Sequence, residues 1–181
     1  MKKFLIVSVL AALIVPAASL GGPNGQDREN AARACRALRA TLGPELFRQS
    51  YGTVQSNRRN AFGKCVSRWT RAEHQNRVSA QSACSTEQAD ANFPAAHDGK
   101  TFAEFYGTGP NHKNAFGKCV SSKAKAASDE ARQNTVNAAR SCKAERAQMG
   151  AGPFREKYGR NASDRNAFGK CVSQLSKAKT A

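Results

Sequence analysis

Six cysteines are the residues of this 181-residue chain whose type and spacing most clearly indicate chemistry. Three of them lie inside an identical eight-residue string, Asn-Ala-Phe-Gly-Lys-Cys-Val-Ser, at residues 60–67, 114–121 and 166–173. Each of the other three precedes one copy of this string, so the sequence is an internal repeat with two cysteines per copy. The repeat register predicts three disulfides, which join Cys35 to Cys65, Cys84 to Cys119 and Cys142 to Cys171.

Other reactive side chains show no comparable order. The three histidines, His74, His97 and His112, occupy unrelated positions, and only one repeat has a histidine near its second cysteine. The sequence has no Cys-x-x-Cys pair for thiol exchange, no serine nucleophile motif and no phosphate-binding glycine loop. We therefore expect no enzymatic activity, no metal site and no cofactor.

Basic residues recur in the repeat register and are the second candidate for a functional role. The net charge of the chain is +16, and each string is preceded by one basic residue and contains another. A basic surface attracts anionic lipid, envelope polymers or nucleic acid. The alternative is that each long side chain lies along a helix with its charge in water. The candidate anion-binding residues are Arg59, Lys64, Lys113, Lys118, Arg165 and Lys170.

This charge is unevenly divided among the repeats. Residues 30–77 carry +8, residues 78–128 carry +1, and residues 129–181 carry +6. Aromatic residues that stack on bases would favour nucleic acid, but Phe47, Phe62 and their counterparts fall where a thin core needs them. The sequence therefore favours an anionic envelope polymer or lipid surface as the partner, and it does not favour nucleic acid.

The elements that position these side chains are predicted to be helices, because helix-forming residues dominate and alternating strand patterns are lacking. A first helix, with Cys35 on its apolar face, ends near Gly43. A short second helix carries the recurrent Phe-x-x-x-Tyr-Gly element, at residues 47–52 in the first repeat. The third helix is predicted to begin near the capping residues Asn57, Asn111 and Ser163.

Two stretches without glycine or proline, residues 64–93 and 118–149, predict long helices that cross from one repeat into the next. A continuous helix places Cys65 about 28 Å from Cys84, which is too far for a disulfide. This distance supports the pairing within repeats.

A glycine two residues before the second cysteine of each repeat weakens this helical prediction. The third helix either begins later than predicted, or a neighbouring backbone passes too close for a side chain. We expect close packing at all three positions, which are Gly63, Gly117 and Gly169.

The N-terminal residues predict export. Lys2 and Lys3 precede an apolar run at residues 4–15, a pattern typical of a signal peptide and too short for a membrane anchor. We expect a secreted or cell-envelope location, where disulfides persist. The predicted organisation is a signal peptide at 1–19, a linker at 20–29, modules 1 to 3 at 30–77, 78–128 and 129–176, and a flexible tail at 177–181.

Large apolar residues are scarce after the signal peptide. Leu, Ile, Val and Phe make up about 12% of residues 20–181, and chains below about 20% often stay disordered. Loop entropy gives each predicted disulfide roughly 3.5 to 4 kcal/mol of stabilisation. We therefore expect folding to depend on oxidation of the cysteines.

The unit of a cysteine helix, Phe-x-x-x-Tyr-Gly and Asn-Ala-Phe-Gly-Lys-Cys-Val-Ser resembles a repeat of small secreted bacterial proteins of unknown function. The resemblance covers nearly the whole chain after the signal peptide, and it implies export and repetition but no activity.

The predicted fold is all-α, with three tandem helical repeats that each hold one disulfide and share long helices. The predicted role is non-enzymatic binding or structure on an anionic surface. The alternative is a cationic membrane-active or antimicrobial factor, which needs an exposed amphipathic helix.

Overall fold

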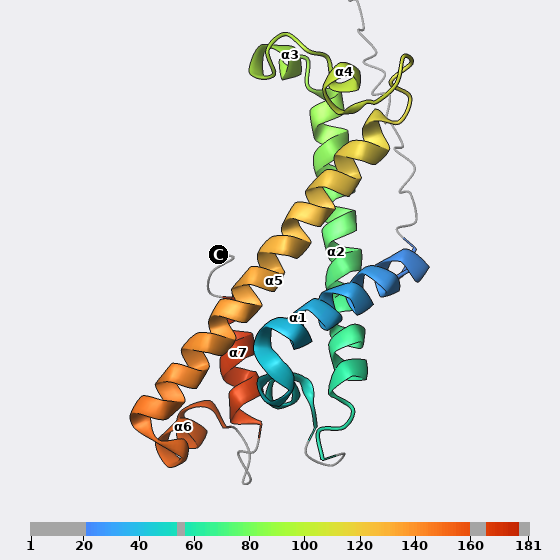
Figure 1. The fold of residues 1–181 in the computed structure, drawn as a ribbon. Helices are drawn as coiled ribbons and strands as arrows, with labels where there is room; N and C mark the ends of the chain where they lie inside the picture. Colours follow the sequence, from blue (N-terminus) through green and yellow to red (C-terminus); the bar gives the residue numbers. More distant parts are fainter. Residues whose placement is uncertain (1–20, 54–56, 160–165, 178–181) are drawn as a thin grey trace, which may run out of the picture.

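The computed structural model describes residues 21–53, 57–159 and 166–177, and within these ranges all regular secondary structure is helical (Figure 1). The predicted signal peptide and Arg165 lie outside the described residues. The helices are α1 (Gly25–Tyr51), α2 (Ala61–Ala89), α3 (Phe93–Ala96), α4 (Phe102–Tyr106), α5 (Ala115–Met149), α6 (Ala151–Tyr158) and α7 (Ala167–Lys177). The prediction of an all-α fold is confirmed.

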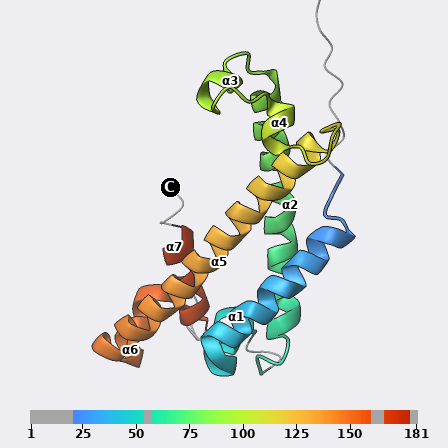
Figure 2. The same cartoon turned by 45° about the horizontal axis from the view of Figure 1, so that its top comes forward.

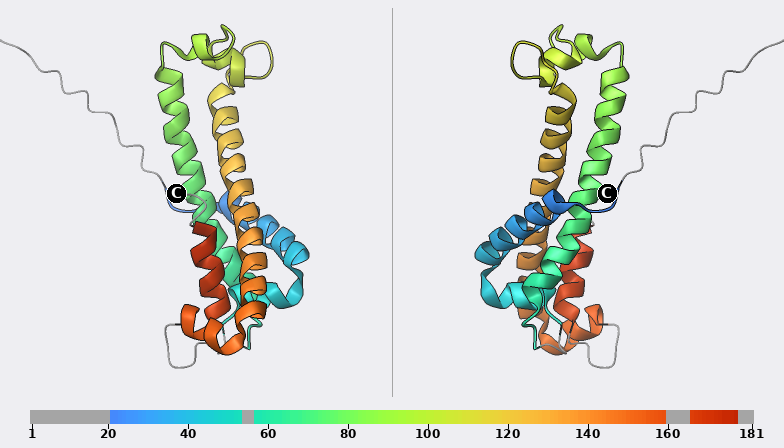
Figure 3. Two further views of the ribbon diagram at one scale, coloured as in Figure 1. Left: turned by 90° about the vertical axis from the view of Figure 1, so that its left-hand side faces the viewer. Right: turned by 90° about the vertical axis from the view of Figure 1, so that its right-hand side faces the viewer.

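Two long helices form the axis of the molecule. α2 and α5 run antiparallel and side by side, and each crosses from one module into the next, as the glycine-free stretches predict (Figures 1 and 3). The short helices α3 and α4 cover one end of this hairpin, which we call the tip (residues 84–123). α1, α6 and α7 pack around the other end, which we call the base (residues 31–69 and 131–177; Figure 2).

α1 contains the two helices predicted for the first module. Asn24 and Asp27 form a capping box, so the helix begins at Gly25, inside the predicted linker. Gly43 interrupts the helix with φ of 75° and ψ of 162°, a conformation open to glycine, and Pro44 restarts it. The predicted break near Gly43 is therefore confirmed.

The third helix of each module begins later than predicted, at Ala61, Ala115 and Ala167. The backbone before the helix explains the difference in modules 1 and 2, because Asn57, Arg58 and His112 have φ of 46°, 60° and 48°, which are not helical. The asparagine of the repeated string closes this turn. Asn60 accepts a hydrogen bond from the Thr53 backbone N–H (3.0 Å), and its Nδ2 donates to Thr53 Oγ1 (2.8 Å). Asn114 and Thr108 repeat this arrangement at 2.9 and 2.7 Å. The asparagine thus closes the turn before the helix instead of capping its first N–H groups.

The later start also corrects the expectation for the glycines. A Cβ atom built on Gly63 or Gly117 would meet nothing within 4 Å, so close packing is the wrong explanation there. Both residues fall in the first turn of their helix, where the cost of glycine is small. Close packing holds only at Gly169, where a Cβ atom would lie 3.0 Å from the Ser50 carbonyl oxygen of α1.

The disulfides join the predicted partners and lie in two separate cores. The bonded cysteines have Cα atoms 6.0, 6.0 and 6.1 Å apart, and all six side chains are fully buried. The core of the base joins modules 1 and 3 and contains the bonds Cys35–Cys65 and Cys142–Cys171. The core of the tip is smaller and contains Cys84–Cys119 with Phe93, Phe102 and Ala115.

Candidate functional site

A cleft at the base gathers arginine side chains from modules 1 and 3. It encloses about 850 Å³ between α1, the turn before α2, the end of α5, α6 and α7. Among the described residues of its lining, Glu45 is the only acidic one, and none is a lysine. The arginines that line the cleft are Arg39, Arg48, Arg58, Arg59, Arg146 and Arg155.

Equivalent positions of modules 1 and 3 line this cleft. Arg39 and Arg146 each lie four residues after the first cysteine of their module. Arg48 and Arg155 each follow the phenylalanine that begins Phe-x-x-x-Tyr-Gly. The same correspondence holds for the aromatic residues of the lining, which are Phe47 with Phe154 and Phe62 with Phe168.

The floor of the cleft is rigid because its aromatic residues belong to the core of the base. Phe47, Phe154 and Phe168 are only 2%, 1% and 6% exposed. Phe47 packs on the Tyr51 ring with centroids 5.1 Å apart, and Phe154 packs on Tyr158 at 4.9 Å. A low-dielectric floor of this kind strengthens the electrostatic attraction between the arginines and a bound anion.

Five of the six arginines are exposed, and hydrogen bonds orient two of them. Arg146 donates to Gln49 Oε1 of α1 at 3.2 Å, and Arg155 Nε donates to the Ala151 carbonyl at 3.1 Å. Arg39 and Arg59 are exposed at the surface. Their guanidinium groups present planar pairs of N–H donors, which match the oxygens of phosphate or carboxylate.

The one carboxylate in the lining is itself paired with basic and polar neighbours. Hydrogen bonds from Gln49 (2.7 Å) and Arg48 (2.9 Å) lower the pKa of Glu45, so it stays ionised at neutral pH. Among the described residues, six arginines and one glutamate give the lining a formal charge of +5. This arrangement can bind an anion, because guanidinium groups stay protonated at neutral pH.

Of the five predicted anion-binding residues that the structure describes, it brings one into this cleft. Arg59 lies in its lining, whereas Lys64 and Lys118 are exposed on α2 and α5 outside it. Lys170 is half-buried in the first turn of α7. Lys113 lines a separate cavity of about 600 Å³ at the tip.

The tip cavity of module 2 lacks the arginines of the cleft. Gln88 and Ala103 occupy the positions equivalent to Arg39 and Arg48. Sequence analysis missed these arginines, although the sequence shows them at equivalent positions of modules 1 and 3. It missed them because the sequence does not show that those two modules are in contact.

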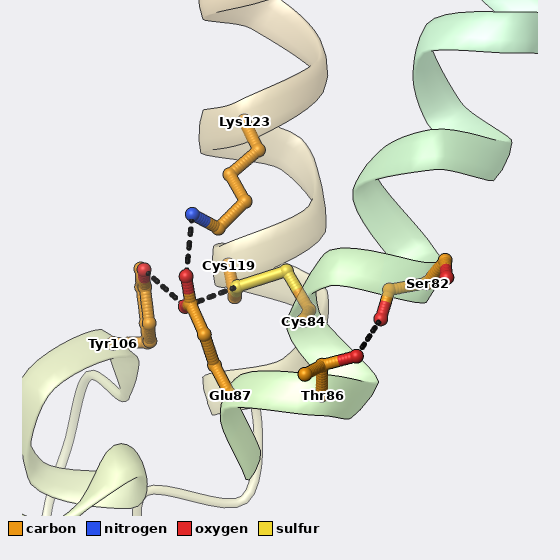
Figure 4. Close-up of a disulfide and its surroundings, with 7 residues drawn as sticks. All are labelled: Ser82, Cys84, Thr86, Glu87, Tyr106, Cys119 and Lys123. Carbon is orange, nitrogen blue, oxygen red and sulfur yellow. Dashed lines mark hydrogen bonds and ion pairs between the residues drawn. A yellow bond between two sulfur atoms is a disulfide. The ribbon is translucent and has the colours of Figure 1, made fainter. Parts of the chain in front are cut away.

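The tyrosine that recurs in each of the three modules packs in a core and forms a hydrogen bond through its hydroxyl. At the tip, the Tyr106 hydroxyl donates to Glu87 at 2.9 Å and Lys123 pairs with Glu87 at 2.8 Å, beside the Cys84–Cys119 disulfide (Figure 4). Burial raises the pKa of Glu87, but the bonds from Lys123 and Tyr106 outweigh it, so the pKa is lowered overall. Glu87 therefore stays ionised and fixes α4 against α2 and α5.

Module 3 repeats this arrangement, because Glu145, like Glu87, lies three residues after the first cysteine of its module, and only module 1 differs. The Tyr158 hydroxyl donates to Glu145 at 2.8 Å, and Lys157 pairs with that carboxylate at 2.6 Å. In module 1 the Tyr51 hydroxyl instead accepts a buried hydrogen bond from Trp69 Nε1 at 3.1 Å. These groups have partners within the fold, which makes a structural role sufficient for them.

The rest of the described chain offers little other chemistry. Within residues 21–53, 57–159 and 166–177, no group of three or more His, Cys, Asp or Glu side chains is placed to hold a metal ion. Among the helices in those same ranges, none combines the length and the apolar character needed to cross a membrane. Comparison with protein-family models, with curated proteins and with solved structures finds no significant match to this chain.

Proposed function

We propose that this chain is an exported, disulfide-bonded helical protein that binds anionic groups of the cell envelope through the arginine cleft of its base. The observation that carries the proposal is the meeting of six arginines from modules 1 and 3 around one cavity. Cations repel one another, so this arrangement costs folding free energy unless an anion offsets it. The cost is more easily explained by binding than by stability.

The distribution of charge also favours the base as the binding end of the molecule. Modules 1 and 3, which form the base, carry most of the net charge, whereas module 2 carries +1. Nucleic acid is a poorer partner because Phe47, Phe154 and Phe168 are packed in the core and have no free ring face for a base. Lipid or polymer phosphate and carboxylate groups need only the guanidinium forks.

The disulfides support an extracytoplasmic setting for this binding. Three fully buried disulfides persist in oxidising compartments and are rare in the cytosol. Together with the predicted signal peptide, they favour a secreted or envelope protein. A membrane-lytic role is less favoured, because the apolar residues Phe168 and Val172 of α7 are buried in the base.

The test compares two pairs of equivalent residues in the full-length oxidised chain. Arg39→Gln with Arg146→Gln removes two charges from the cleft, and Lys64→Gln with Lys118→Gln removes two charges outside it. Binding is measured to inorganic polyphosphate and to phosphatidylglycerol-containing vesicles, with phosphatidylcholine vesicles as the neutral control. Circular dichroism checks that both variants are folded.

We expect the arginine variant to bind at least about tenfold more weakly, since each charge-assisted hydrogen bond contributes about 1.5 to 3 kcal/mol. The lysine variant should lose about threefold or less, because Lys64 and Lys118 lie outside the cleft and act on its ligand only through screened, longer-range attraction. Binding of the wild type should fall steeply with salt. Equal losses in the two variants, or binding that does not depend on salt, would overturn the proposal.

A further inference from the structure

An apolar cavity adjoins the arginine cleft and shares part of its wall. It has a volume of about 520 Å³, and its own lining includes Leu42, Leu46, Ala147 and Ala151, with Lys143 at its edge as a further cation. Five residues line both cavities, so the two cavities are directly adjacent. The residues that line both are Pro44, Glu45, Gln49, Arg146 and Phe168.

The apolar cavity lies where two equivalent helix breaks come together. Gly43 and Gly150 each lie eight residues after the first cysteine of their module. They adopt nearly the same conformation, with φ and ψ of 75° and 162° in one and 86° and 163° in the other. The first half of α1 ends at Gly43, and α5 ends at Gly150. Apolar residues near these breaks are therefore not fully covered: Leu46 is half-buried, and Ala147 and Ala151 are exposed.

We infer that these two cavities together bind a single lipid anion, with a phosphate headgroup among the arginines and an alkyl chain in the apolar cavity. The inference rests on the proposed function and names the ligand class of the same cleft. Arg146 lies at the boundary, because it lines both cavities. A cationic cavity that joins an apolar one is complementary to an amphiphile, whereas a fully hydrophilic polymer would leave the apolar cavity hydrated.

The charge of the lining favours phosphate over carboxylate. The formal charge of +5 far exceeds the single charge of a fatty acid carboxylate. A phosphate monoester carries about −1.5 to −2 at neutral pH and has three acceptor oxygens, so several guanidinium groups can bind it at once. The ionised Glu45 lies in both linings and repels the headgroup at the boundary, which directs the phosphate toward the far arginines.

The experiment uses the full-length oxidised chain and three probes below their critical micelle concentrations. Isothermal titration calorimetry compares decyl phosphate with inorganic phosphate, which lacks the alkyl chain, and with decyl maltoside, which lacks the charge. We expect decyl phosphate to bind at least about tenfold more tightly than inorganic phosphate, and decyl maltoside not to bind. From octyl to decyl phosphate, each methylene should strengthen binding about two- to fourfold, since the cavity is open on one side and buries only part of the chain.

Two variants separate the headgroup site from the chain site. Ala147→Gln places a polar side chain in the apolar cavity, and Ala126→Gln makes the same exchange at an exposed position of α5 away from the base. Ala147→Gln should lower the affinity for decyl phosphate to that for inorganic phosphate and leave inorganic phosphate binding unchanged. Arg146→Gln should weaken both phosphates, and Ala126→Gln should weaken neither.

Two further results distinguish failure of this inference from failure of the proposed function. If decyl phosphate binds no more tightly than inorganic phosphate, or if Ala147→Gln has no effect on it, the lipid inference is wrong. The proposed function then still stands, provided that polyphosphate binding depends on Arg39 and Arg146. If neither phosphate nor polyphosphate binds, both proposals are wrong. Glu45→Gln should strengthen decyl phosphate binding about two- to fivefold, because it removes the repulsive charge, and weaker binding would contradict the assigned headgroup position.

Discussion

The two ends of the α2–α5 hairpin contain the same repeated string in different surroundings (Figure 2). At the base, modules 1 and 3 pack on each other and share one core of 20 buried residues. At the tip, module 2 packs alone, and five buried residues form its core. Phe105 of the tip remains 45% exposed, the one large apolar side chain so exposed in the described ranges.

This comparison separates what the repeated string does from what its neighbours do. In every module the string supplies a buried cysteine and the first turn of a helix. The arginines of the cleft that modules 1 and 3 share at equivalent positions lie outside the string. Arg39 and Arg146 line one cleft at the base, whereas the equivalent Gln88 of the tip has no opposing module. Similar modules can therefore form different surfaces, because only two of them meet.

Removal of one disulfide from each end should have the largest effect. Cys142→Ser with Cys171→Ser should destabilise the whole chain by about 2 to 5 kcal/mol, a loss of about 4 to 20 °C in melting temperature. Cys84→Ser with Cys119→Ser should instead unfold the tip locally. Circular dichroism melting and hydrogen exchange measure the two outcomes.

In the tip variant, amide protection should disappear from α3 and α4 and persist in α1 and α7, because those helices belong to the core of the base. Equal loss of protection at both ends would show that the molecule unfolds as one unit. The separation into base and tip would then be wrong.

Removal of a tyrosine hydroxyl should also cost more stability at the base than at the tip, but by less than removal of a disulfide. Tyr51→Phe leaves the buried Trp69 Nε1 without its acceptor, which should cost about 1 to 3 kcal/mol. Tyr106→Phe at the half-buried tip should cost about 1 kcal/mol or less, because water can replace the hydroxyl. Urea denaturation followed by the fluorescence of Trp69, the only tryptophan, measures the base directly.

A larger effect of Tyr106→Phe than of Tyr51→Phe on this signal would contradict the assignment of the stronger core to the base. Trp69→Phe provides the matched control at the other end of the hydrogen bond. It should be studied by circular dichroism, since it removes the fluorescent probe.

Replacement of a buried carboxyl group midway between the two ends should stabilise the chain, by an amount that depends on pH. Glu73 of α2 is 6% exposed, and the Ser128 hydroxyl of α5 lies 2.9 Å from it. Burial raises the pKa of Glu73, and the charges of Asp27 and Asp129 raise it further. The folded-state pKa of Glu73 therefore lies above its unfolded-state pKa. Below the unfolded-state pKa the residue costs no stability, and the cost grows as the pH rises through the folded-state pKa. Glu73→Gln should stabilise the chain at pH 7 by on the order of 1 kcal/mol and have little effect near pH 4.

Asp27→Asn is the control of opposite sign. A hydrogen bond from Arg77 lowers the pKa of Asp27, so its contribution is present above the unfolded-state pKa and disappears as the pH falls. The variant should be destabilised at neutral pH and approach the wild type in acid. Thermal melting between pH 3 and 8 tests both residues, and parallel curves for the two variants would contradict the assignment.

The smallest effect is expected from transfer of the arginines to the tip. Gln88→Arg with Ala103→Arg gives module 2 the residues of Arg39 and Arg48 but no opposing module. Calorimetric affinity for inorganic phosphate should rise about twofold or less, as for other exposed charges. A tenfold gain would show that one module suffices to make the site.

The sequence by itself determined the local and register-dependent features of this protein. Helix-forming composition predicted an all-α chain, Gly43 marked the break in α1, and the repeat register selected all three disulfides. These features depend on backbone preferences within a few turns, or on the equivalence of the copies. The sequence misplaced the start of α2 because Asn57, the predicted cap, and Arg58 have φ of 46° and 60°, so the helix begins only after the turn that Asn60 closes onto Thr53.

Only the tertiary structure decided that modules 1 and 3 share a core and form the arginine cleft. The antiparallel hairpin of α2 and α5 returns the chain to its starting end, so the beginning of α2 and the end of α5 lie at the same end of the molecule (Figures 1 and 3). Residues as distant as Arg39 and Arg146 then line one cavity. The pairing of whole faces depends on the total apolar area that each arrangement buries, and no short segment of sequence specifies that quantity.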